Sequence, residues 1–265
     1  CAQQIAGRLL VAIAPRVGAI GTEGIQWVRG MRQVVIACHL EAVARERRFE
    51  AWRPRIGKAR DALGVTGGPA TYALRLAESL AARPDLALTV LTDRRDRFGH
   101  LRAAVVEVPG GAGLGRIAWQ HWKLPRALRA VRPDVYHDTK NALPCRLSVP
   151  GVVTVHDLAH LRCPETFGFL SRLFLRVSTS DAVKRARRIV VPSESTARDI
   201  AEAFPAAAAN VRVVPHGITP FRPPSGEALA RVSARVGGTP FVLHGGTIQA
   251  RKNVDLLVRA VRPAT

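Results

Sequence analysis

Cysteine is scarce in this sequence of 265 residues, and the four cysteines lie far apart, at Cys1, Cys38, Cys145 and Cys163. No C-x-x-C pair is present, which excludes the usual ligand spacing of a zinc site and the dense framework of a small disulfide-stapled domain. We therefore predict reduced thiols with a structural role and no metal site.

Long apolar runs are also missing. The stretch Leu9–Ala14 is typical of the longest ones, whereas a membrane-spanning helix needs about 20 residues. Arg8 and Arg16 stand around that short stretch, so the N-terminal segment makes a poor signal peptide. We expect no transmembrane segment and a cytoplasmic chain.

Acidic residues are few beside the basic ones. Twenty Asp and Glu stand against forty Lys and Arg, a net charge of +20, and only five of the basic residues are lysine. This balance suits nucleic acid, an anionic membrane or phosphorylated ligands, although an arginine-rich codon bias would produce it as well. Because the basic residues are spread along the chain, without a Lys/Arg run or interleaved aromatic residues, we predict no nucleic-acid partner.

The apolar residues that are present are arranged for an α/β fold. From about Gly64 onward, short apolar runs alternate with stretches of helical spacing, as in βαβ units. The predicted strands are Leu86–Leu91, Ala103–Val108, Asp134–His137, Val152–Val155, Ile189–Val191, Val211–Val214 and Phe241–His244. The predicted helices are Ala70–Ala82, Arg116–Val131, Leu170–Ala186, Ser195–Phe204 and Val254–Val261, with Pro125 expected to kink or split the second. The elements predict a mostly parallel sheet covered by helices.

The domain organisation follows from breaks in this pattern. Residues 1–56 have a weak signal, in which Gln33–Leu40 is a candidate strand, and we treat them as an uncertain N-terminal extension. The sequence Pro215-His216-Gly217 is followed by several more prolines, which is typical of a linker. We predict one domain over 57–218 and the start of a second over 219–265.

The clearest candidate for a ligand site lies near the C-terminus. A predicted strand runs through Gly245 and Gly246 into a helix that Asn253 is expected to cap. Arg251 and Lys252 would then stand at a helix N-terminus, where free N–H groups and the positive end of the helix dipole favour a phosphate or diphosphate. The alternative is that the two cations are solvated and the glycines only form a turn.

Two further places qualify because ligands bind at the carboxyl ends of strands in open α/β sheets. Gly67 and Gly68 belong to a glycine-rich loop that opens a helix, which predicts either a phosphate cradle or a structural turn. His156 and Asp157 follow a buried strand, so the imidazole could contact a sugar hydroxyl or take part in proton transfer, or the pair could cap a turn.

The helix around Trp119 combines aromatic and basic residues and could lie on an anionic membrane, or pack into the core with snorkelling arginines.

Taken in order, the motifs of the chain resemble those of a retaining glycosyltransferase of family 4. The matching blocks are Gly67–Tyr72, Asp134–His137, Val153–Asp157 with Pro164-Glu165, Val190–Ser195 with Asp199, Val213–Gly217, and Leu243–Thr247 with Arg251–Asn253. The resemblance implies the two-domain GT-B fold, with a Rossmann-like acceptor domain and the beginning of a second Rossmann-like domain that binds the nucleotide sugar.

The resemblance also implies roles for individual residues. His156 would contact the transferring sugar or organise the reaction centre, and Gly217 would belong to the hinge between the domains. The donor diphosphate would be bound by residues of both domains, namely Gly67, Gly68, Gly246, Thr247, Arg251 and Lys252. The implied partners are a GDP- or UDP-linked sugar and a glycan or lipid-linked acceptor, with no resident cofactor.

The function implied is transfer of a hexose, mannosyl or glucosyl, with retention of configuration. Peripheral contact with anionic lipid at the inner face of the membrane would fit a lipid-linked acceptor. Family members carry a pair of glutamates further along the donor domain than Thr265, so we expect a truncated donor domain and little transferase activity from this chain alone. The alternatives are a non-catalytic module that binds nucleotides or polyanions, and a GT-B nucleotide-sugar epimerase.

Overall fold

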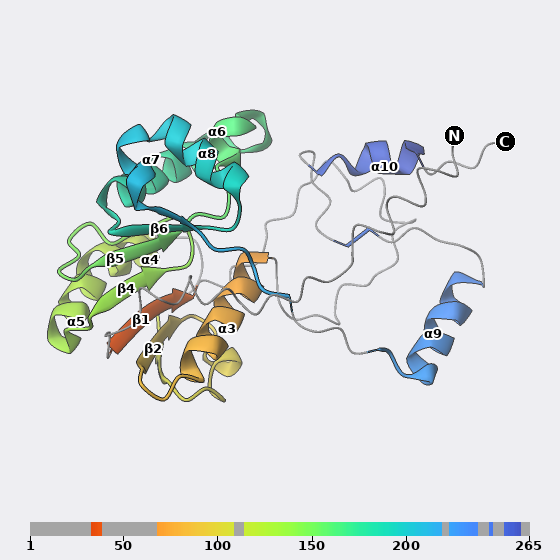
Figure 1. Cartoon of the computed structure of the whole chain (residues 1–265), viewed down its shortest axis with the longest axis horizontal. Helices are drawn as coiled ribbons and strands as arrows, with labels where there is room; N and C mark the ends of the chain where they lie inside the picture. The colour runs from red at the N-terminus through yellow and green to blue at the C-terminus, as the bar shows by residue number, and fades with distance from the viewer. Residues whose placement is uncertain are drawn as a thin grey trace.

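A computed structural model describes residues 33–38, 68–108, 114–218, 223–237, 244–245 and 252–260. Within them, parallel strands form one seven-stranded sheet in the order β3-β2-β1-β4-β5-β6-β7 (Figure 1). The strands are β1 (Gln33–Cys38), β2 (Ala87–Thr92), β3 (Ala104–Glu107), β4 (Val135–Asp138), β5 (Gly151–Thr154), β6 (Arg188–Val191) and β7 (Val211–Val213). The predicted α/β architecture with a parallel sheet is confirmed.

Strand β1 stands in the middle of the sheet, between β2 and β4. It confirms the candidate strand at Gln33–Leu40, and it comes from the range that the sequence assigned to an N-terminal extension. Residues 1–56 therefore supply a strand of the sheet. This strand joins the pair β2 and β3 to the strands β4 to β7. The division of the chain at residue 57 stays a prediction.

The helices that connect the strands match the predicted ones closely. The described α-helices are α3 (Gly68–Ala81), α4 (Leu114–Ala118), α5 (Leu124–Val131), α6 (Ala159–Arg162), α7 (Phe169–Arg185), α8 (Glu194–Ala203), α9 (Gly226–Val236) and α10 (Val254–Ala260). Helix α9 begins in the segment predicted to be a linker, because Ser225 caps it by accepting a hydrogen bond from the Ala228 N–H at 3.2 Å. The predicted strand at Phe241–His244 lies almost wholly outside the described residues.

Pro125 is accommodated in a way that differs from a simple kink. The chain passes from α4 through a π-helical turn, Trp119–Lys123, into α5, and Pro125 falls in the first turn of α5. A proline is tolerated there because its missing N–H would have no partner within the new helix. Trp119 packs against the core and Trp122 is exposed, so the aromatic residues of this segment divide between core and surface.

The core lies on both faces of the sheet, in two clusters. Val153 and Ile189 belong to the cluster under α5, α7 and α8, whereas their chain neighbours Val152 and Val190 belong to the cluster under α3. Successive side chains of a strand point to opposite faces, so a strand buried on both faces is mostly apolar, and its polar residues need partners inside the core. This explains why continuous apolar runs predicted these strands correctly.

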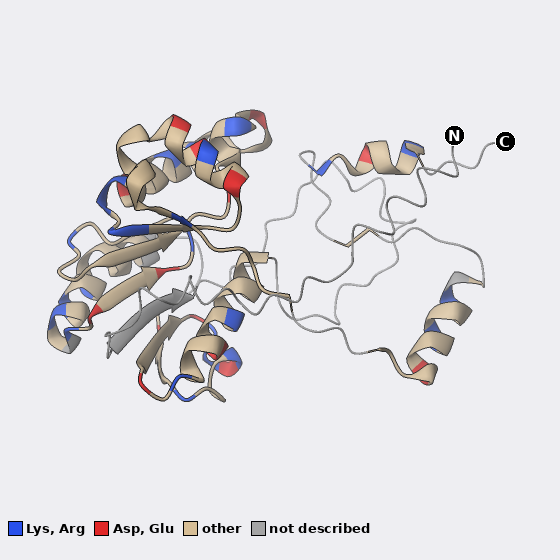
Figure 2. Cartoon of the chain, viewed as in Figure 1, with Lys and Arg blue, Asp and Glu red and all other residues tan. Residues whose placement is uncertain are grey.

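No helix in the described ranges is both long and apolar enough to cross a membrane. The basic residues of the sheet domain are distributed over many helices and strands and do not gather on one element (Figure 2). The described part of the chain thus carries its positive charge as a general property of the surface.

Candidate active site

Three aromatic rings meet at the carboxyl edge of the sheet. Tyr72 comes from the first turns of α3, His156 follows β5 and His216 follows β7. The Tyr72 and His156 ring centroids are 5.0 Å apart in an edge-on arrangement, Tyr72 and His216 are 4.9 Å apart, and the two imidazoles are 5.6 Å apart. We call these three residues the ring cluster. It lies where a doubly wound sheet offers its ligand site, near the point at which the strand order reverses.

A hydrogen-bonded chain lies beneath the ring cluster. The hydroxyl of Tyr72 is 3.1 Å from Thr154 Oγ1, and the same Thr154 oxygen is 2.8 Å from His137 Nε2. Thr154 and His137 are both buried, so this chain fixes the position of the Tyr72 ring from inside the core. The threonine therefore joins α3 to two neighbouring strands.

His156 is held by backbone and side-chain contacts from two other elements. Its Nε2 donates to the Thr139 carbonyl oxygen at 3.0 Å, and its own carbonyl accepts a 3.3 Å bond from the Thr196 hydroxyl. Because a carbonyl can only accept, the proton of the neutral ring sits on Nε2, which leaves Nδ1 as the acceptor atom of the imidazole. The half-buried ring is thus oriented before any ligand arrives.

The histidines of the site favour the neutral form. Burial lowers the pKa of His156, with a smaller contribution from nearby His216, while the hydrogen bond to Thr139 opposes the change. Partial burial also lowers the pKa of His216, although much of its surface remains open. Burial lowers the pKa of His137 to about 4. At neutral pH these imidazoles can hydrogen-bond a hydroxyl group and accept a proton.

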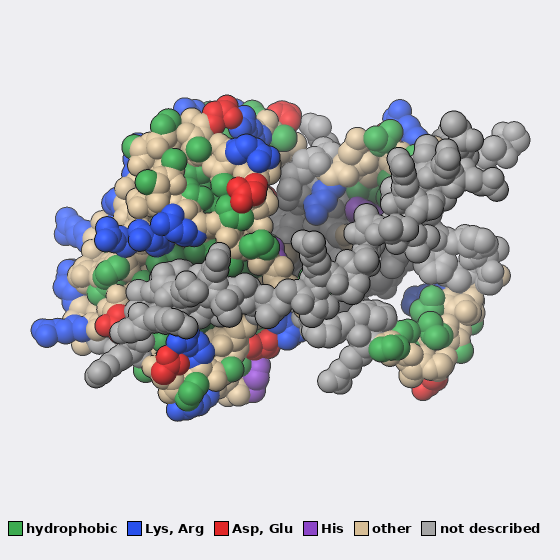
Figure 3. Space-filling model, viewed as in Figure 1, with side chains coloured by type: hydrophobic (Ala, Val, Ile, Leu, Met, Phe, Trp, Pro, Cys, Tyr) green, Lys and Arg blue, Asp and Glu red, His purple; other side chains and the backbone are tan. Residues whose placement is uncertain are grey.

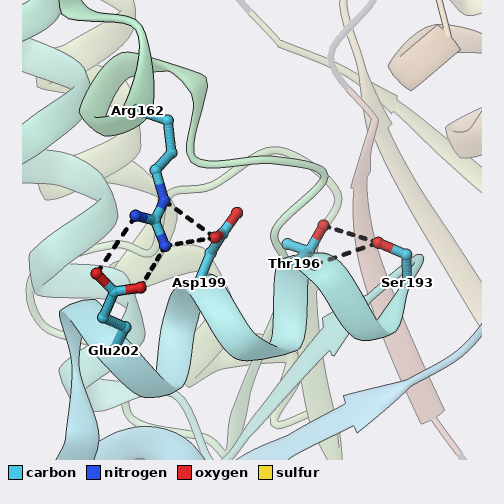
Figure 4. Close-up of polar contacts among 5 residues, drawn as sticks. All are labelled: Arg162, Ser193, Thr196, Asp199 and Glu202. Atoms are coloured by element: carbon cyan, nitrogen blue, oxygen red, sulfur yellow. Dashed lines mark hydrogen bonds and ion pairs between the residues drawn. The ribbon is translucent and has the colours of Figure 1, made fainter.

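The segment that follows His156 is tied to helix α8 (Figure 4). Arg162 contacts Asp199 at 2.6 Å and Glu202 at 2.5 Å, and at the start of the same helix Ser193 accepts from the Thr196 N–H at 3.2 Å. The ion pairs are partly exposed, so their main effect is to orient the two helices and their contribution to stability is small. Thr196, which also contacts His156, is positioned by that helix start.

Sequence reasoning identified His156 but missed its two ring partners. Tyr72 was part of the glycine-rich motif and His216 part of the Pro-His-Gly motif, yet neither was assigned a role. Their positions could have indicated a ligand contact, because Tyr72 lies near the start of a helix and His216 follows a strand, and both places fall at the carboxyl edge of a parallel sheet. Thr154 and His137 lie inside strands, and nothing in the sequence marks them.

The other predicted site residues divide into two groups. Gly68 is the first residue of α3, Gly217 follows His216 and Lys252 precedes α10, and all three are exposed. Four more lie outside the described residues, namely Gly67, Gly246, Thr247 and Arg251. The proposed diphosphate site is therefore not assembled by the described residues.

The start of the last helix differs from the N-cap predicted at Asn253, and none of the residues of that helix is buried. Asn253 has a left-handed backbone with φ of 49°, whereas an N-cap residue usually has an extended one. Val258 and Leu256 are 40% and 58% exposed, and α10 has no buried residue. A helix buries an apolar face only against another layer, and no described strand packs beneath this one.

Among the residues that the structure describes, no group of three or more His, Cys, Asp and Glu side chains could hold a metal ion. Cys145 and Cys163 are free thiols, as predicted.

Comparisons with known proteins agree with the architecture. The family model for Glycosyltransferase Family 4 matches residues 66–222, more than half of the chain. A search of curated protein sequences gives no match.

Solved structures of Anabaena Alr3699/HepE are similar in fold. The complex with UDP and glucose aligns with a TM-score of 0.52 at 17% identity, over 89% of this chain and 58% of that one. The complex with UDP-glucose aligns with a TM-score of 0.51 at 15% identity, over 86% and 57%. This chain thus spans less than two thirds of the length of the HepE chains that it matches.

Proposed function

The chain belongs to Glycosyltransferase Family 4, and on that premise we propose that it transfers a hexose from a nucleotide sugar to an acceptor with retention of configuration. The sugar we propose is mannosyl or glucosyl, on a GDP or UDP carrier. The similar HepE structures hold UDP with glucose or UDP-glucose, which supports this class of donor.

The observation that carries the proposal is the ring cluster. His156 is oriented by Thr139 and kept neutral by burial, so its Nδ1 can accept a hydrogen bond from a hydroxyl of the transferring sugar. Tyr72 and His216 stand within ring contact of it and would form the walls of the same subsite. Aromatic and imidazole rings of this kind suit the face of a hexose, which presents both C–H and O–H groups.

The donor diphosphate is proposed to lie against residues from both parts of the chain. Arg251 and Lys252 would offset the negative charge that develops on the leaving nucleotide, an electrostatic role that needs no metal. The backbone at Gly67, Gly68, Gly246 and Thr247 would approach the phosphates closely, with Gly217 in the hinge between the acceptor domain and the start of the donor domain. We propose no resident cofactor, so transfer should survive removal of divalent cations by EDTA.

The acceptor is proposed to be a glycan or a lipid-linked sugar, reached at the inner face of a membrane to which the protein binds peripherally from the cytoplasm. The net charge of +20 supports attraction to anionic lipid. Nucleic acid is not among the partners that we propose.

The proposal is tested first by ligand binding. Histidine resonances of the labelled chain are followed by NMR while UDP-glucose or GDP-mannose, and then a candidate acceptor, is added. His156 and His216 should shift, whereas His100, which is exposed and lies beside Glu78, six residues after Tyr72 on α3, should not. Shifts confined to other histidines would contradict the site.

Turnover, which we expect to be low for this chain alone, is tested next by release of the nucleoside diphosphate. His156→Ala should lower the rate at least about 100-fold, and His100→Ala should leave it unchanged. Transfer that does not depend on His156, or a product of inverted configuration, would refute the proposal. Free or isomerised sugar formed without an acceptor would favour the epimerase instead, and binding without release would favour the non-catalytic module.

A further inference from the structure

Helix α7 carries an apolar face that no described element covers. Phe169, Leu170, Leu173, Phe174 and Val177 are each between 49% and 77% exposed. At about 100° per residue, these five side chains fall within an arc of about 140° on one side of the helix. Single exposed apolar residues are common on proteins, but a contiguous set of this size marks an interaction surface.

The opposite face of α7 is the one that packs on the protein. Its buried residues are Thr179, Ala182 and Val183, all in the second half of the helix, which contacts β5 and the turn before β7. The first half contributes no buried residue. The second half of the helix therefore packs on the fold by one side, and the apolar face of its first half is covered by no described element.

The charged residues that this part of α7 itself contributes all have one sign. Arg172 and Arg176 are exposed and lie along one border of the apolar arc, and no described carboxylate pairs with either of them. From Thr166 to Ser180 the sequence has no acidic residue, and the first one, Asp181, is bound to Arg185. A neutral or acidic partner surface would fit these arginines, and a basic one would not.

The position of this face relative to the ring cluster is set by the topology. In a parallel sheet, a helix that connects two strands begins near the carboxyl edge of the first strand and runs back toward the start of the second. Helix α7 follows β5, so its first half lies toward the edge that carries His156 and its end leads into β6. Figure 1 shows α7 among the helices on one side of the sheet, and Figure 3 shows basic side chains interleaved with apolar ones on the visible face of this domain.

We propose that the first half of α7 binds the surface of an anionic bilayer. Its five apolar side chains would enter the boundary between headgroups and acyl chains, and Arg172 and Arg176 would contact the lipid phosphates. We choose lipid because the first half of α7 combines large exposed apolar side chains with two exposed arginines and has no carboxylate of its own. The inference rests on the proposed function in one respect only. If the acceptor is bound to the membrane, docking through α7 would bring it to the carboxyl edge of the sheet, where the ring cluster lies.

The test is sedimentation of the 265-residue chain with vesicles, which needs neither donor nor turnover. Vesicles of phosphatidylcholine mixed with phosphatidylglycerol should bind the chain, and vesicles of phosphatidylcholine alone should bind it at least about tenfold more weakly. The double variant Phe169→Ser, Leu170→Ser should lower binding to the mixed vesicles about tenfold or more. The control is Leu229→Ser with Val232→Ser, which removes two exposed apolar side chains from α9 and should bind as the parent does.

The charges are tested in the same assay. Arg172→Gln with Arg176→Gln should weaken binding to the mixed vesicles about tenfold, and Arg129→Gln with Arg198→Gln, which changes net charge equally on α5 and α8, should weaken it much less. If both double variants weakened vesicle binding equally, the net charge of the chain and not the position of the arginines would explain binding, and the proposal would be overturned.

Two further results would also overturn it. One is equal binding to neutral and mixed vesicles. The other is a dimer in solution that the Phe169 and Leu170 double variant converts to monomer, because a second copy would then be the partner of this face. A chain that binds vesicles but whose His156 and His216 resonances do not shift with a nucleotide sugar would refute the proposed function and leave this inference standing.

Discussion

The buried imidazole of His137 should make the protein less stable as the pH falls through the range in which free histidine titrates. His137 is 5% exposed, its Nε2 is bonded to Thr154, and burial lowers its pKa to about 4. In the unfolded chain the same group has a pKa near 6.5. Between these values the unfolded state binds more protons than the folded state, so the free energy of unfolding decreases as the pH is lowered.

The size of the effect follows from the two pKa values. Stability from His137 is fully present above pH 6.5 and is lost progressively toward pH 4. Between pH 7.5 and pH 5 the loss is about 2 kcal/mol, and it approaches about 3 kcal/mol when the folded form is also protonated. Several other histidines have lowered pKa values and will add to the total, so the measurement must isolate the share of His137.

The assay is urea unfolding at pH 7.5 and pH 5 for the parent chain and for His137→Asn. Asparagine keeps a polar group near Thr154 but cannot take up a proton, so the variant should lose about 2 kcal/mol less than the parent over this pH range. The control is His100→Gln, which measures the effect of removing an exposed histidine outside the core.

The comparison is made on the change with pH, so that any general destabilisation by the substitution cancels. Parallel curves for the parent and His137→Asn would refute the reasoning, because they would mean that His137 titrates equally in the folded and unfolded states. A steeper loss in the variant would refute it as well.

Three further substitutions test the packing around the site by urea unfolding. Thr154→Val should cost about 2 kcal/mol because it leaves the buried His137 nitrogen without a partner, whereas Thr154→Ser keeps the hydroxyl and should cost about half as much; equal costs would contradict this role of the hydroxyl. Gly151→Val should cost about 1–3 kcal/mol, since a Cβ at Gly151 would already stand 2.6 Å from Leu147 Cδ2, and an unchanged midpoint would show that Leu147 moves away freely. Ser193→Ala should cost about 1 kcal/mol through loss of the helix cap, and Ser193→Asp should restore it.

Local patterns predicted most of the sheet correctly. Val152–Val155 and Ile189–Val191 were recognisable because a strand covered on both faces is mostly apolar, with Thr154 as the one polar residue of these two runs. Helix α8 was recognisable from the helical spacing of Ser195–Phe204, and only the structure shows that Ser193 caps its start. The π-helical turn before Pro125 was not, since it depends on how Trp119 meets the core.

The candidate site was predictable only in part. His156 follows a strand, and that position alone indicates a ligand contact in an α/β fold. His216 and Tyr72 join it because β7 and α3 lie on either side of the central strands, a fact of sheet order that the linear spacing of 144 residues between them does not reveal. Thr154 is a strand residue like any other until the fold sets it between the Tyr72 hydroxyl and His137.

By itself, the sequence determined the fold class, the family and one imidazole of the site, because apolar periodicity and short motifs are properties of neighbouring residues. The tertiary structure alone decided which rings meet, which histidines stay neutral and which face of α7 remains uncovered. Those properties depend on distance and burial, and both are set by residues that the chain brings together from far apart.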